Sequence, residues 1–106
     1  MNINIDEKGI EKIIEHYEAS KQLCVHMEEC AELIQAISKL IRGADDDDTW
    51  NAKKEHLREE MADVIVCISQ LQSMFNITDA DIAMYAEYKI DRQLRRIENE
   101  NKRHND

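Results

Sequence analysis

Residues 23–41, LCVHMEECAELIQAISKLI, and residues 57–75, LREEMADVIVCISQLQSMF, decide the fold of this chain. In each stretch apolar residues return at alternating intervals of four and three, the period of one face of an α-helix. The first row is Leu23, Met27, Cys30, Ile34, Ile37 and Ile41, and the second is Leu57, Met61, Val64, Ile68, Leu71 and Phe75. Both stretches therefore predict long amphipathic helices.

Each stretch also carries apolar residues outside its row, namely Leu33 and Leu40 in the first and Ile65, Val66, Cys67 and Met74 in the second. A helix that is apolar on more than one side is buried on more than one side. One chain of 106 residues hardly covers both helices by itself. We therefore predict an all-α, four-helix bundle whose core is completed by oligomerisation, as a homodimer or homotetramer.

Local signals place four helices at about 8–18, 20–42, 51–75 and 79–99 in a single domain spanning 1–106. Ser20 is a candidate N-cap, and Gly43 sits where a C′ glycine belongs. Thr78 and Asp81 resemble a capping box in which Asp replaces Glu. The run 44–49 is expected to be an acidic loop, and the polar tail 99–106 is expected to fray.

Composition excludes most other architectures. The chain has no proline and two glycines, so it lacks the turn residues that a β-sandwich or barrel requires. It also lacks a glycine-rich phosphate loop. Charged residues make up 35% and aromatic residues 5%, a balance typical of helical proteins.

The net charge of −9 argues against nucleic-acid binding through the overall field of the protein. No apolar run approaches the ~18 residues of a membrane span, and the N-terminus lacks a signal-peptide pattern. The three cysteines lack CxxC spacing. They are expected to be reduced and buried, which indicates a cytoplasmic protein.

Two acidic pairs interrupt the apolar pattern: Glu29 with Glu32, and Glu60 with Asp63. A spacing of three places both carboxylates on one helix face, about one turn apart. Like charges at this distance repel, and more strongly when they are partly buried. A bound divalent cation would compensate them, although acids at this spacing also commonly decorate a solvated helix face.

The ligand type favours a hard cation such as magnesium or manganese, because carboxylates without paired His or Cys suit such ions. A di-iron bundle would instead need two Glu-x-x-His pairs. The sequence contains no Glu followed by His at three residues. Ferritin-like iron chemistry is therefore a poor fit.

These motifs resemble the MazG-like, all-α nucleoside triphosphate pyrophosphohydrolases, in particular small phage-type and Firmicute-type members. Residues 28–39, EECAELIQAISK, look like the first motif helix of that family, and residues 59–64, EEMADV, look like the second. Residues 89–96, KIDRQLRR, resemble its basic C-terminal motif. The similarity covers roughly residues 10–97. Glu18 departs from it, because the family pattern has glycine after the tyrosine.

The resemblance implies hydrolysis of a nucleoside triphosphate between the α and β phosphates, with a nucleoside monophosphate and pyrophosphate as products. By position, Glu29, Glu32, Glu60 and Asp63 would be the catalytic magnesium ligands, with manganese as a substitute. Magnesium would orient the triphosphate and lower the pKa of a bound water. Either Glu29 or Glu32 would accept the proton of that water.

Further binding residues follow from the same resemblance and from helical spacing. Lys89, Arg92 and Arg96 fall at i, i+3 and i+7 on one helix face and would grip the phosphates. Lys39 lies seven residues after Glu32, on a similar side of its helix. Surface ion pairing is the alternative role for all of these cations.

The base would contact Trp50, His26 or Gln22. Trp50 begins the third helix near the acidic loop and could stack on a base, or it could anchor the loop. His26 and Gln22 lie one and two turns before Glu29, where a partly buried structural role is equally open.

Three functions are compatible with the sequence. The first is magnesium-dependent hydrolysis of a broad set of nucleoside triphosphates for nucleotide-pool house-cleaning. The second is a narrower pyrophosphatase acting on dCTP or dUTP. The third is a non-catalytic helical protein that regulates or binds a partner.

Overall fold

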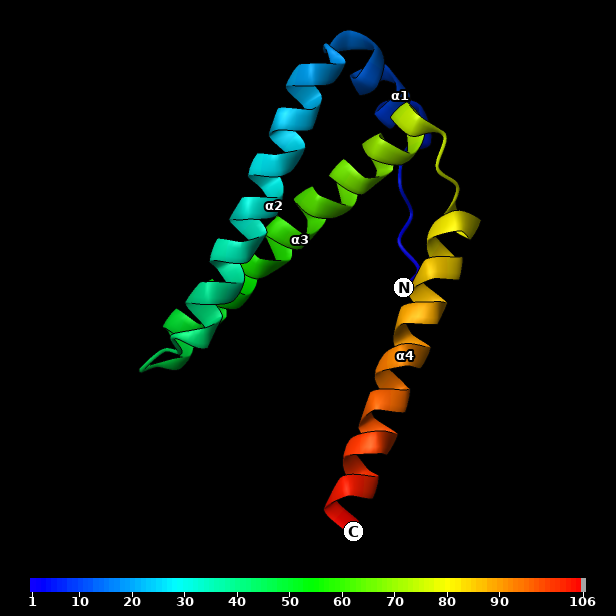
Figure 1. Cartoon of the computed structure of the whole chain (residues 1–106). Coiled ribbons are helices and arrows are strands. Elements are labelled where there is room, and N and C mark those ends of the chain that lie inside the picture. Colours follow the sequence, from blue (N-terminus) through cyan, green and yellow to red (C-terminus); the bar gives the residue numbers. More distant parts are fainter. Residues whose placement is uncertain (106) are drawn as a thin grey trace. The chain divides into compact units, whose positions relative to one another are not determined.

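The computed structural model describes residues 1–105, which form four α-helices (Figure 1). Their bounds are α1 Glu7–His16, α2 Ala19–Ile41, α3 Asp47–Phe75 and α4 Asp79–Asn105. No strand occurs among these residues, so the all-α, four-helix prediction is confirmed. None of the described helices combines the length and the apolar character that a membrane span requires. The chain divides into two compact units: Met1–Asn76 contains α1 to α3, and α4 belongs to the second, which begins at Ile77.

In the first unit, α2 and α3 form an antiparallel hairpin, and α1 packs against α3 (Figure 1). The connection turns at Gly43, whose φ of 73° is left-handed, as predicted for a residue that follows a helix end. Lys53 Nζ donates hydrogen bonds to the carbonyl oxygens of Lys39 and Gly43, at 3.0 and 2.5 Å. A side chain of α3 thus holds the C-terminal carbonyls of α2, which ties the two helices together at the turn.

The acidic connection is shorter than the predicted loop 44–49, because α3 begins at Asp47 rather than near residue 51. The Asp46 side chain caps this helix by accepting a hydrogen bond from the Thr49 amide at 2.7 Å. Asp47 and Asp48 then occupy the first turn, where carboxylates interact favourably with the helix dipole. The acidic run is therefore a helix start.

The junction of α1 and α2 also differs from the prediction in detail. The first helix ends at His16, not residue 18, and α2 begins at Ala19, so Ser20 lies inside its first turn and is not the N-cap. The buried Gln22 joins the two helices instead. Its Nε2 donates to the carbonyl oxygens of Ile14 and Tyr17, at 3.2 and 2.7 Å.

The residues by which α2 faces α3 each lie one position before a residue of the most apolar row of α2. None of the residues in the row that faces α3 is exposed. This facing row consists of Gln22, His26, Glu29, Leu33, Ala36 and Leu40. The most apolar row of α2, Leu23 to Ile41, forms an outer row. In that outer row Met27, Ile34 and Ile41 are 68, 67 and 82% exposed. The single chain therefore leaves most of this row uncovered.

On α3 the apolar row from Leu57 to Phe75 is divided between partly buried and exposed residues. Leu57, Val64 and Leu71 are partly buried, but Met61, Ile68 and Phe75 are exposed. The remaining facing positions are taken by Glu60, Cys67 and Met74. Both helices therefore use a facing register that carries a carboxylate near its middle.

The exposed rows of the two helices lie on one side of the hairpin. One residue advances the direction of a side chain by about 100° around a helix axis. Because α2 and α3 run in opposite directions, one step from the facing rows turns both toward the same side. Three steps, from Glu29 to Glu32 and from Glu60 to Asp63, turn the acids toward the other side. The hairpin thus has one apolar side and one acidic side.

The second unit is built on α4. Its start is a reciprocal capping box, as predicted: the Thr78 amide donates to Asp81 Oδ2 at 2.9 Å, and the Asp81 amide donates to Thr78 Oγ1 at 3.1 Å. The helix continues to Asn105, beyond the predicted end near residue 99. No Gly or Pro interrupts it, and the last turn carries Lys102, Arg103 and His104, which suit a helix C-terminus.

The cysteines differ in burial. Cys67 is buried on the facing side of α3, as expected. Cys24 and Cys30 are exposed in the chain, because they lie on the outer sides of α2 rather than on its facing row. All three are free thiols.

Candidate metal centre

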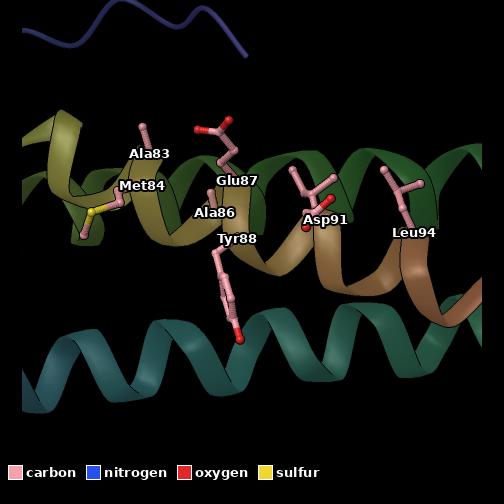
Figure 2. A pocket seen from close by; sticks show the side chains of 8 residues that line it. Ala83, Met84, Ala86, Glu87, Tyr88, Asp91 and Leu94 are labelled. Atoms are coloured by element: carbon pink, nitrogen blue, oxygen red, sulfur yellow. The ribbon is translucent and has the colours of Figure 1, made fainter.

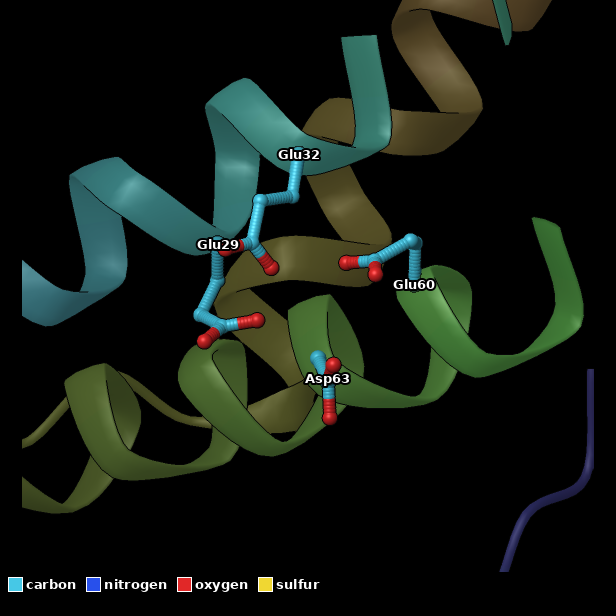
Figure 3. Close-up of side chains that lie close together, drawn as sticks. All are labelled: Glu29, Glu32, Glu60 and Asp63. Carbon is cyan, nitrogen blue, oxygen red and sulfur yellow. The ribbon is translucent and has the colours of Figure 1, made fainter. Parts of the chain in front are cut away.

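Four carboxylates meet at the middle of the α2–α3 hairpin (Figure 3). Each of Glu29, Glu32, Glu60 and Asp63 offers one oxygen, and these four oxygens all lie within 4.8 Å of one another. Glu60 is buried at 7% exposure and Glu29 is half-buried, whereas Glu32 and Asp63 are exposed. The structure therefore brings together all four acids that the sequence singled out.

The local fold explains this convergence. Glu29 and Glu60 belong to the facing rows, so the packing of α2 on α3 carries them toward each other. Glu32 and Asp63 follow by three residues and stand one turn further along on the same face. Two antiparallel helices thus supply two carboxylates each to one small volume (Figure 3).

The cluster makes ionisation of Glu29 and Glu60 less favourable. Burial, together with the charges of Glu32 and Asp63, raises the pKa of Glu29 to about 6. Burial likewise raises the pKa of Glu60, again reinforced by Glu32 and Asp63. Without a counter-charge, four ionised carboxylates in this volume destabilise the fold.

Two carboxylate oxygens in the cluster are buried and have no hydrogen-bond partner among the described residues: Glu29 Oε2 and Glu60 Oε2. An unpaired buried acceptor costs free energy, so native proteins normally pair such atoms. A cation bound between the helices would satisfy both oxygens and offset the repulsion. An all-oxygen donor set is the kind that magnesium and manganese prefer.

One residue at the cluster was not singled out from the sequence. His56 lies one turn before Glu60 on α3, and its Nε2 is 3.3 Å from Glu60 Oε1. Its charge is the one influence that lowers the pKa of Glu60. The i, i+4 spacing in residues 56–60 is the signal that could have identified it.

His26 and Gln22, the predicted base-binding residues of α2, lie inside the first unit. His26 is 4% exposed, and its Nε2 lies 2.6 Å from Gln70 Oε1 of α3. Gln22 uses its amide nitrogen to join α1 and α2. Both side chains retain one buried polar atom without a partner among residues 1–105, His26 Nδ1 and Gln22 Oε1. Their contacts are structural, and a role in base binding stays a prediction.

Lys39 and Trp50 are both exposed and lie near the turn of the hairpin. Lys39 is two turns beyond Glu32, on the acidic side of α2. Trp50 is in the first turns of α3 and points about 140° away from Asp63 around the axis. The spacing thus places Lys39 with the acids and Trp50 with the exposed apolar row, and their ligand contacts stay predictions.

Lys89, Arg92 and Arg96 are exposed on α4, in the second unit. They share one side of this helix and form no ion pair within the described residues, whereas Arg95 pairs with Asp91. A hollow along α4 is lined by residues of that helix alone, including Met84, Tyr88 and Leu94 (Figure 2). None of the three cations lines it, so they occupy a separate face of α4.

An all-α hairpin with a four-carboxylate candidate metal centre defines a class of helical proteins with an oxygen-donor cation site. Comparison with protein families narrows this class. A model of the MazG nucleotide pyrophosphohydrolase domain matches residues 17–93, and the chain belongs to this family. The match includes all four acids, Lys89 and Arg92, and it confirms the resemblance seen in the sequence. Searches of curated proteins and of solved structures return no match.

Proposed function

We propose that this protein hydrolyses nucleoside or deoxynucleoside triphosphates at the α–β phosphate bond, releasing a nucleoside monophosphate and pyrophosphate. The observation that carries this proposal is the convergence of four carboxylates in a chain of the MazG pyrophosphohydrolase family. The role would be house-cleaning of the nucleotide pool. Three free thiols suit the reducing cytoplasm in which we place it.

The four acids would hold Mg²⁺, with Mn²⁺ as a substitute. Their donor set fits such an ion, and the unpaired oxygens of Glu29 and Glu60 point to a missing counter-charge. When bound, magnesium would neutralise the triphosphate and activate a water. Glu29 or Glu32 would accept the proton of the attacking water, the α–β bridging bond would break, and pyrophosphate would leave.

The cations would bind the rest of the triphosphate. Lys89, Arg92 and Arg96 present three positive side chains on one side of α4, none paired within residues 1–105. Arg can bind phosphate oxygens through two parallel hydrogen bonds. We propose that this side of α4 grips the β and γ phosphates, with Lys39 as a further phosphate contact and Trp50, His26 or Gln22 as contacts to the base.

Product analysis tests the reaction. Incubation with each of the canonical NTPs and dNTPs in Mg²⁺ should release equal amounts of pyrophosphate and monophosphate, and EDTA should abolish release. Orthophosphate with a diphosphate product would mean that a different bond breaks. Strong preference for dCTP or dUTP would identify the narrow enzyme, and similar rates across the panel would identify the broad one.

We also propose that two copies at least assemble through the apolar side of the hairpin. The exposed residues of the α2 outer row repeat at intervals of three and four, and Met61, Ile68 and Phe75 of α3 extend the same side. A 4,3 repeat of apolar residues is the pattern by which helices pack on one another. A second copy offers an identical face, which suits a two-fold interface, and the acidic side would remain open.

Ile34→Glu is expected to shift the assembly toward a single chain of 12.5 kDa, because it places a charge in the middle of the outer row. The monomer fold should survive, since Ile34 makes little of the internal core. Light scattering during gel filtration measures the mass. Gln35→Glu adds the same charge on another exposed side of α2 and should leave the mass unchanged. A wild-type protein that is monomeric at micromolar concentration would contradict this interface.

A further inference from the structure

His56 engages one oxygen of Glu60 and leaves the other unpaired. The imidazole Nε2 is 3.3 Å from Glu60 Oε1, whereas Glu60 Oε2 is buried without a partner among the described residues. An ionised carboxylate oxygen can only accept, so an imidazole with its proton on Nε2 would be the donor in this contact. The two oxygens of Glu60 are thus differentiated before any cation binds.

The surroundings of Glu60 make this contact distinctive. Its acidic neighbours in the cluster are Glu32 and Asp63, which repel its charge. His56 approaches from the preceding turn of the same helix and provides a nitrogen donor. The side chain of His56 is 36% exposed against 9% for Glu60, so the imidazole sits between the buried carboxylate and solvent.

We propose that His56 is a positioning residue of the metal centre, which holds the Glu60 carboxylate through Oε1 so that Oε2 is presented to the cation. This inference rests on the proposed metal site. Partners that orient a ligand from outside the coordination shell are worth about 10- to 100-fold in metal affinity. An i, i+4 ion pair at the surface of a helix contributes little to folding. The contact should therefore matter more for the cation than for the fold.

The test is a Mg²⁺ titration of thermal unfolding without nucleotide, for the whole chain. His56→Leu removes the donor, and we expect it to raise the Mg²⁺ concentration for half-maximal stabilisation by about tenfold. His56→Gln retains an amide N–H at a similar reach and should stay within about threefold of the wild type. His104→Leu makes the same replacement on α4 and should change nothing.

The outcomes separate this inference from the proposed function. An unchanged midpoint in His56→Leu, beside a normal wild-type response, would overturn the role of His56 and leave the metal site standing. Equal losses in His56→Gln and His56→Leu would also overturn it, because the donor would then not matter. A wild-type protein that neither Mg²⁺ nor Mn²⁺ stabilises would overturn the metal site, and this inference with it.

Discussion

Glu60→Gln is expected to lower nucleotide turnover by about three orders of magnitude, the scale of losing one preorganised electrostatic group in an active site. The amide preserves the shape of the side chain but removes a negative charge at the most buried position of the cluster. An amide is also a weak ligand for Mg²⁺ compared with a carboxylate. Pyrophosphate release under saturating Mg²⁺ and substrate is the measurement.

The same variant should be at least as stable as the wild type in EDTA. Burial and the neighbouring carboxylates raise the pKa of Glu60 above its ordinary value of 4.5, so the ionised form is disfavoured in the folded chain. That cost is present at neutral pH and disappears as the pH falls through the raised pKa toward 4.5. A neutral amide removes it at every pH, and thermal unfolding in EDTA at pH 7.5 will show this.

Glu59→Gln is the matched control, because it removes the same charge from the adjacent, exposed residue of α3. It should change neither turnover nor Mg²⁺-dependent stabilisation. Full activity in Glu60→Gln would contradict the proposal that Glu60 serves catalysis in the metal centre. If no activity depends on Glu60 and the variant gains stability, the non-catalytic helical protein would be favoured. Lost activity with lost stability in EDTA would instead assign Glu60 to the fold.

The location of the acidic cluster could be predicted because two local regularities determine it. A spacing of three residues puts two carboxylates on one helix face, and a short connection makes consecutive helices antiparallel neighbours. The two regularities together therefore predict that Glu29 and Glu60 lie close to each other. What spacing cannot supply is their difference in burial, which depends on how closely α2 approaches α3.

The facing register could not be predicted from apolarity, and the reason is physical. The most apolar row of α2 runs from Leu23 to Ile41, but Gln22, His26 and Glu29 are on the side that faces α3. His26 contacts Gln70 of α3, Glu29 joins the acidic cluster, and Gln22 binds carbonyls at the end of α1, so polar contacts occupy the facing side. Hydrophobic periodicity indicates that a row of side chains is buried. It does not indicate whether the residues that bury it belong to the same chain or to another copy.

His56 and the base-binding candidates illustrate the same limit. The proposed role of His56 depends on the distance between its Nε2 and one oxygen of Glu60. A residue pattern does not contain such a distance. His26 and Gln22 have the right spacing to accompany Glu29, yet His26 contacts Gln70 and Gln22 donates to the carbonyls at the end of α1. Spacing selects a side of a helix, and packing then decides which groups on that side remain available.

Arg92→Met is expected to lower kcat/KM for a nucleoside triphosphate by about 30- to 150-fold, equivalent to about 2–3 kcal/mol for lost hydrogen bonds to a charged group. The guanidinium has no partner among the described residues, so its donors are available for a phosphate. Met keeps a long unbranched side chain and removes the charge. Steady-state kinetics with the best substrate of the panel, at saturating Mg²⁺, provide the comparison.

Arg95→Met is the matched control, three residues further along the same helix. Arg95 already pairs with Asp91 and points to another side of α4, so its loss should leave kcat/KM within about twofold, as for an exposed ion pair. The Mg²⁺ midpoint of thermal stabilisation should be unchanged in both variants, because neither residue belongs to the carboxylate cluster. Equal effects of the two replacements would mean that α4 contributes only its net charge. A loss confined to Arg92→Met would show that one side of α4 recognises the phosphates. The acids of the hairpin cannot bind phosphates themselves unless a cation lies between the two negative groups.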